Sequence, residues 1–257
     1  MTLRLSAGLR NFVNQNGSIR DALQGGELQI YSGAQPATAD SAVSGTLLAT
    51  ITDNNAARTA EVLATGTVTL TGGAAGSINT LTVGGVNIID AAVPFNTSLG
   101  QTATDLAAMI NNSDSTPEYN ATVSGSVVTI QANRGSGATA NTLVVTATLT
   151  TITATYANMS GGVSAVNGLK FGISAAGVLP KRASQTWSGV AVASGTAGWF
   201  RFVGAVADAG GLDSTESTVR MDGSISTSGA QLNMSSTTIT SGATQTIATF
   251  PITLPTS

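Results

Sequence analysis

The sequence predicts a mainly β protein: a β-sandwich or jelly-roll-like host domain carrying a small inserted α+β domain. Two observations lead to this fold class. Short alternating segments, separated by turns rich in Gly, Ser and Asp, recur towards both ends of the 257-residue chain. Between them, residues 78–148 predict a hairpin, a helix, a second hairpin and a final strand, in the order ββαβββ. We therefore expect residues 1–62 and 163–257 to form the host and residues 63–162 the insertion.

The N-terminal part of the host predicts two short helices within residues 6–24. Ser6 is a candidate N-cap of the first helix, and Ser18 with Asp21 forms a capping-box-like start of the second. Neither helix is long enough to be stable alone, so their apolar residues must pack on the host sheet or on a neighbouring subunit. Two prolines near the C terminus fit an edge strand or a tail lying on a neighbour. The candidate assembly contacts are therefore Leu9, Phe12, Ile19, Leu23, Pro251 and Pro255.

Alternating or apolar segments give the expected host strands. These are residues 27–31, 46–51, 169–173, 185–193, 198–206, 218–225, 231–240 and 245–254. Large aromatic residues gather in what the pattern indicates is one hairpin: Trp187, Trp199, Phe200 and Phe202. We interpret them as the host core, with a carbohydrate-stacking platform as the alternative.

The insertion carries its own folding signals. Residues 66–72 alternate as a strand, and Gly84-Gly85 supplies the positive φ angles that a tight hairpin needs. Ser98 and Gln101 predict a capping box at the start of a helix over residues 98–111. Residues 119–130 predict the second hairpin and residues 142–148 the final strand.

The composition indicates a neutral, polar surface. Charged residues make up 9% of the chain, against about 25% in typical proteins, so Thr, Ser, Asn and Gln must cover most of the exterior. Burying such a surface in an assembly desolvates few ions, which favours an assembling protein over the alternative, a soluble secreted β protein. A net charge of −3 with few Lys and Arg argues against nucleic acid as a partner. We also expect neither a membrane span nor a cleaved signal peptide.

The residues available for chemistry are few. The chain has no His and no Cys, which removes the commonest general base, the common nucleophile systems and ordinary zinc sites. Paired carboxylates are still possible, as glycoside hydrolases use them, and the candidates are Asp208, Asp213, Glu216 and Asp222. Their Gly- and Ser-rich surroundings favour a solvated loop. Whether the Asp208–Asp222 loop holds Ca²⁺ is left open, and we expect no catalytic residues, cofactor or metal.

Two regions resemble known families. Residues 3–11, 28–40 and 45–50 are similar to a widespread family of uncharacterised phage and prophage structural proteins of the head or tail. Residues 82–88, 104–111, 121–125 and 128–130 are similar to the flagellin IN motif, although Gly84-Gly85 stands where that motif usually has Asn-Gly. Together these regions cover less than half of the chain.

The resemblance implies a non-enzymatic bacteriophage virion protein, assembled in the bacterial cytoplasm and found in the virion. A capsid decoration or cement protein is the first expectation, and a tail, neck or collar component that contributes to host adhesion is the alternative. Its partners would be major capsid or tail proteins and further copies of the chain, without nucleic acid or membrane; a host-surface glycan is left open. A phage depolymerase using Asp and Glu, and a bacterial surface adhesin, are the competing classes.

Overall fold

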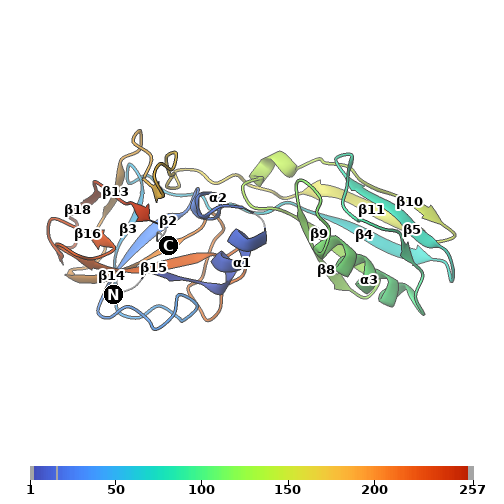
Figure 1. The fold of residues 1–257 in the computed structure, drawn as a ribbon, viewed down its shortest axis with the longest axis horizontal. Helices are drawn as coiled ribbons and strands as arrows, with labels where there is room; N and C mark the ends of the chain where they lie inside the picture. The colour runs from blue at the N-terminus through green and yellow to red at the C-terminus, as the bar shows by residue number, and fades with distance from the viewer. Residues whose placement is uncertain (1–2, 16, 254–257) are drawn as a thin grey trace. The chain divides into compact units, whose positions relative to one another are not determined.

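The computed structural model describes residues 3–15 and 17–253 and confirms a mainly β fold built of antiparallel sheets, consistent with a β-sandwich-like architecture. The chain divides into two compact units (Figure 1). Unit 1 comprises Met1–Glu61 and Ala165–Ser257, and unit 2 comprises Val62–Ser164.

Unit 1 contains two short helices and eleven of the strands. They are β1 (Arg4–Leu5), α1 (Ala7–Gln15), α2 (Ile19–Leu23), β2 (Glu27–Ser32), β3 (Leu47–Asp53), β12 (Val178–Leu179), β13 (Trp187–Val190), β14 (Gly195–Val203), β15 (Arg220–Ser226), β16 (Leu232–Asn233), β17 (Thr238–Ile239), β18 (Thr244–Ile247) and β19 (Ile252–Thr253). Seven strands lie side by side in the order β1-β15-β14-β2-β3-β13-β18. Only the β15–β16 pair is parallel among the described strand pairs. The predicted helices and the strands at residues 27–31 and 46–51 are confirmed.

Trp187, Phe200 and Phe202 belong to the core of unit 1, whereas Trp199 is buried outside that cluster, and the four residues do not lie in one hairpin. Trp187 is on β13 and Phe200 and Phe202 are on β14, and β2 and β3 lie between these two strands in the sheet. Phe171 and Phe250 complete the cluster, with Phe171 and Trp187 in an edge-on contact at 5.4 Å. The single-hairpin prediction was wrong because strands near each other in the chain were assumed to pair.

Three of the predicted host strands are also corrected. Residues 169–173 form only isolated bridges, from Leu169 to Gly26 and from Phe171 to Lys181. The segment 231–240 is broken into β16 and β17, because β16 pairs with β15 while β17 pairs with β14. The segment predicted at 245–254 is likewise broken into β18, which pairs with β13, and β19, which pairs with β12. A chain that changes partner within ten residues cannot stay one straight strand.

Unit 2 consists of two sheets and one long helix around a core of its own. Its elements are β4 (Thr65–Gly72), β5 (Ser77–Val83), β6 (Val86–Asn87), β7 (Val93–Pro94), α3 (Leu99–Asn111), β8 (Tyr119–Ser124), β9 (Val127–Ala132), the 3₁₀ turn η1 (Gly137–Ala140), β10 (Val145–Thr150) and β11 (Thr153–Ser160). One sheet has the order β11-β4-β9-β8, and the other has β10-β5-β6 with β7 also on β5. Figure 1 shows α3 lying along β8, its main contact.

Unit 2 has more strands than the sequence predicted. Both hairpins, the helix and the strand at residues 66–72 are present, but β7 and β11 were missed. At the helix start, the Ser98 hydroxyl accepts from the Gln101 backbone N–H, as expected. The reciprocal half of the predicted capping box does not form: the Ser98 N–H donates to the Asn96 carbonyl, and the Gln101 amide donates to Asp105.

Candidate functional site

The strongest concentration of polar contacts in unit 1 lies along β14 and β15, beside the start of α1. Arg220, Asp222 and Ser224 alternate along β15 and are all buried, and Met221 between them and Ile225 directly after them belong to the hydrophobic core. A strand turns successive side chains to opposite faces, so the polar residues share the face away from the aromatic core. Both faces of this part of the sheet are therefore covered, and the charged residues on it must be paired.

Arg201 and Asp222 form a fully buried ion pair across β14 and β15. The two residues are direct register partners, and both side chains have 0% exposure. Nε donates to Oδ1 at 2.8 Å and Nη2 to Oδ2 at 2.7 Å, a bidentate arrangement that holds both carboxylate oxygens. Burial raises the pKa of Asp222, and the hydrogen bonds and charge of Arg201 offset part of that rise.

An aromatic stack borders this pair. Tyr31 lies parallel to Trp199 with ring centroids 4.6 Å apart, and the Arg201 guanidinium is 5.6 Å from the Trp199 ring. Burial raises the pKa of the Tyr31 hydroxyl, while the charge of Arg201 lowers it in part. The hydroxyl donates to Gln29 Oε1 at 2.9 Å. The stack thus closes the side of the ion pair against water, which strengthens the electrostatic attraction within it.

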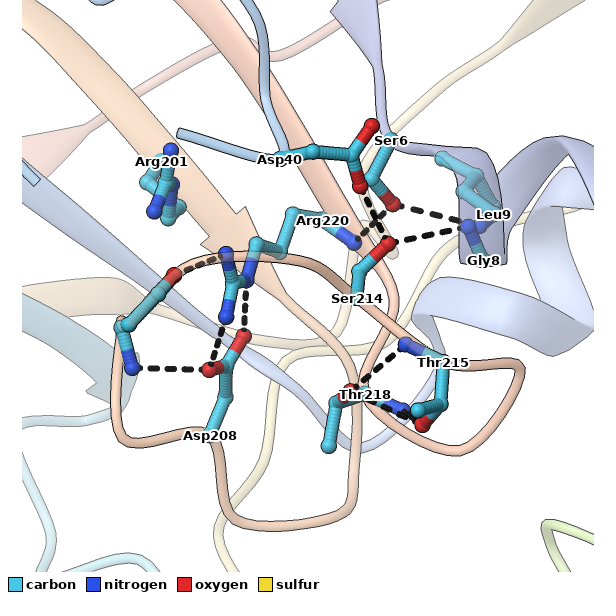
Figure 2. Close-up of polar contacts among 12 residues, drawn as sticks. Ser6, Gly8, Leu9, Asp40, Arg201, Asp208, Ser214, Thr215, Thr218 and Arg220 are labelled. Carbon is cyan, nitrogen blue, oxygen red and sulfur yellow. Dashed lines mark hydrogen bonds and ion pairs between the residues drawn. The ribbon is translucent and has the colours of Figure 1, made fainter. Parts of the chain in front are cut away.

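A second buried ion pair ties the loop after β14 to β15 (Figure 2). Arg220 Nε donates to Asp208 Oδ2 at 2.5 Å and Nη2 donates to Oδ1 at 2.7 Å, while Nη1 donates to the Gly211 carbonyl at 2.7 Å. Burial lowers the pKa of Arg220, but the hydrogen bond and charge of Asp208 outweigh it, so the pKa is raised overall. Asp208 also accepts from the Gly210 backbone N–H. The pair fixes the base of the loop, while Gly211, Leu212 and Asp213 at its tip stay exposed to solvent, in line with the predicted solvated loop.

The same loop also reaches the first turn of α1. Asp40 accepts from the Ala7 N–H at 2.9 Å, and Ser214 Oγ accepts from the Gly8 N–H at 2.9 Å while donating to Asp40 at 2.6 Å. These bonds occupy N–H groups that no helical carbonyl can reach.

Ser6 completes the cap. Its Oγ accepts from the Leu9 N–H at 3.2 Å, which confirms the expected N-cap, and from the Arg220 N–H at 3.0 Å. Figure 2 shows Ser6, Ser214 and Asp40 gathered at the helix start. The network therefore joins α1 to β15 and to two loops distant in the sequence.

The four predicted carboxylates do not form a catalytic pair. Asp208 and Asp222 are each held by a different arginine, Asp213 is exposed at φ 61°, and Glu216 is partly exposed. Each of these two carboxylates has both oxygens held by its arginine, so neither is free to face a substrate. Over residues 3–15 and 17–253, no three acidic side chains are grouped to hold a metal ion. The structure thus gives the Asp208–Asp222 loop no carboxylate cluster for Ca²⁺.

Sequence reasoning missed Arg201 and Arg220. Both lie inside segments predicted as strands, next to aromatic or apolar residues. In a chain with so few charges, an arginine at such a position was the available signal of a buried ion pair.

The candidate assembly contacts fall into different environments. Leu9, Phe12 and Leu23 are buried in the core of unit 1, so they pack on their own sheet and present no surface. Ile19 is partly buried and lines a groove of about 560 Å³ together with Leu179 and Ile252.

Of the two C-terminal candidates, Pro251 and Pro255, only Pro251 can be placed. Pro251 is exposed and lines a neighbouring pocket of about 340 Å³, which also includes Ile252. Pro255 lies outside the described residues. Ile252 lines both the Ile19 groove and the Pro251 pocket, and we call the two together the Ile252 surface.

The arrangement has a structural rather than a chemical character: it cross-links strands and loops with paired charges. Within the described residues, no helix has the length and apolar character needed to cross a bilayer. Comparison with protein-family models, with curated proteins and with solved structures gives no match.

Proposed function

We propose that this chain is a non-enzymatic structural component of a bacteriophage virion, most simply a decoration or cement protein on the capsid exterior. The observation that carries the proposal is that many charged residues of unit 1 are paired inside the unit. Its nine acidic and nine basic residues balance, and three buried or nearly buried ion pairs take up six of them inside the unit. The exterior is then mostly hydroxyl and amide groups, which assemble with little ion desolvation.

Attachment is assigned to the Ile252 surface of unit 1. It combines the partly buried Ile19 and the exposed Pro251 with a concave shape that a neighbouring protein can fill. Many copies on a symmetric scaffold would each present this surface to the same site. A major capsid protein is the proposed partner.

Unit 2 is proposed to be an inserted α+β domain that projects from the particle. Within unit 1 Thr59 pairs with Val166, and within unit 2 Val62 pairs with Val163. The chain thus enters and leaves each unit at adjacent points, as expected of an insertion.

A chain lacking residues 66–161 should fold and still bind the particle; an insoluble product, or one that no longer binds, would contradict this.

The decisive experiment adds purified chain to undecorated heads. We expect binding at regular lattice sites and greater resistance of the heads to heat. The variant Ile19→Glu should abolish binding, while Val123→Glu on unit 2 is the matched control. Labelling confined to the tail, neck or collar would replace decoration by the alternative role, with a contribution to host adhesion to be tested next.

A further inference from the structure

Charge is distributed unevenly within unit 2. Its four acidic residues and its one basic residue all fall between Asp90 and Arg134, whereas residues 62–89 and 135–164 carry none. The strands β4, β5, β10 and β11 are therefore uncharged along their whole length. Residues 90–134, which include α3, β8 and β9, therefore have a net charge of −3, and the rest of the unit has no charged residue.

Each of the two sheets has one edge marked by proline and charge and an opposite edge that has neither. Strand β8 directly follows Pro117 and Glu118, and β7 contains Pro94, with Asp90 just before it. Proline and charge at an edge block the addition of another strand, and α3 also contacts β7 and β8. The opposite edges, β10 and β11, have neither proline nor charge.

Side chains from β11 close the edge of β10. Asn158 Oδ1 accepts from the Val145 N–H at 3.1 Å, and the Ala147 backbone hydrogen-bonds the Tyr156 hydroxyl. The C-terminal end of β11 is covered too, since Met159 exchanges backbone hydrogen bonds with residues 142 and 143.

The edge that remains without a neighbouring strand is the outer edge of β11, from Thr153 to Ala157. In the described part of the chain, β4 alone pairs with β11. Thr153, Thr155 and Ala157 are exposed.

We propose that this edge is an interface in which β11 pairs antiparallel with β11 of a second copy, forming one sheet across a two-fold axis. The edge is self-complementary because its exposed side chains are small and uncharged, and Thr–Thr cross-strand pairs are favourable. The acidic segment 90–134 would repel the same segment of a second copy, which favours contact between copies through the uncharged strand β11. The inference goes beyond the proposed function, because it concerns unit 2 and needs no particle.

The test measures the mass of the purified full-length chain by sedimentation over a wide concentration range. The wild-type chain should dimerise, and Thr155→Lys and Thr155→Glu should each weaken the dimer about tenfold or more. Mixing the two variants should restore association through opposite charges. Thr122→Lys, at an exposed position on the protected edge β8, is the control and should dimerise like the wild type.

Circular dichroism of each variant verifies that unit 2 is folded. A wild-type chain that stays monomeric at every concentration would overturn the proposal. So would a dimer that folded Thr155→Lys does not weaken, or one that Thr122→Lys weakens equally. Because no virion protein is present, these outcomes are independent of whether the chain binds heads.

Discussion

Replacing Asp222 by Asn should destabilise unit 1 strongly, because it leaves the Arg201 guanidinium buried without a counter-charge. Both side chains of the pair have 0% exposure, so solvent cannot compensate. Removing one partner of such a pair costs about 3–5 kcal/mol. At a denaturant dependence of about 2 kcal/mol per M urea, the midpoint of unfolding should fall by about 1.5–2.5 M.

Tryptophan fluorescence reports this loss selectively. Both tryptophans, Trp187 and Trp199, belong to unit 1, and unit 2 contains none. Asp213→Asn is the matched control, since Asp213 is exposed and Asn tolerates its positive φ; its effect should stay within about 0.5 kcal/mol.

A double variant separates the charge from the packing. Arg201→Met with Asp222→Leu removes both charges and keeps apolar volume, so it should recover most of the stability or exceed the wild type by about 1–4 kcal/mol. If Asp222→Asn unfolds at the same urea concentration as Asp213→Asn, the Arg201–Asp222 pair is not a buried, water-excluded bridge.

Three further predictions concern unit 2. Leu106→Ala removes a fully buried side chain of α3 and should cost about 2–5 kcal/mol, seen as an earlier circular dichroism transition while the tryptophan signal of unit 1 is unchanged. Ser98→Ala should cost about 1 kcal/mol through loss of the helix cap, whereas Gln101→Ala should cost clearly less because no reciprocal capping bond exists; equal losses in thermal unfolding would refute this. Hydrogen bonds from Asn96 and Gln101 lower the pKa of Asp105 below 3.8, so its carboxylate contributes stability above pH 3.8 that is lost as the pH falls through the folded pKa. Asn96→Ala should raise that pKa towards 3.8 in an NMR titration, and an unchanged value would contradict the assignment.

Local signals predicted much of the fold and little of the polar network. Ser6 and Ser18 were recognised as helix caps because a cap depends on residues three positions apart. Strand β11 was missed because its partner β4 is distant in the chain, with Thr71 and Thr153 separated by 82 positions in their hydrogen bond. The alternation of exposed and buried residues within β11 does not indicate which strand pairs with it.

The sequence by itself determined the mainly β class, the helix starts, the scarcity of charge and the absence of His and Cys. Each of these follows from composition or from spacing within a few residues. Only the tertiary structure decided that Arg201 meets Asp222, that Arg220 meets Asp208, and that β11 is the edge left open. The physical reason is that a strand's neighbour and register are set by packing of the whole sheet, so two charges become an ion pair only once the core has placed them face to face.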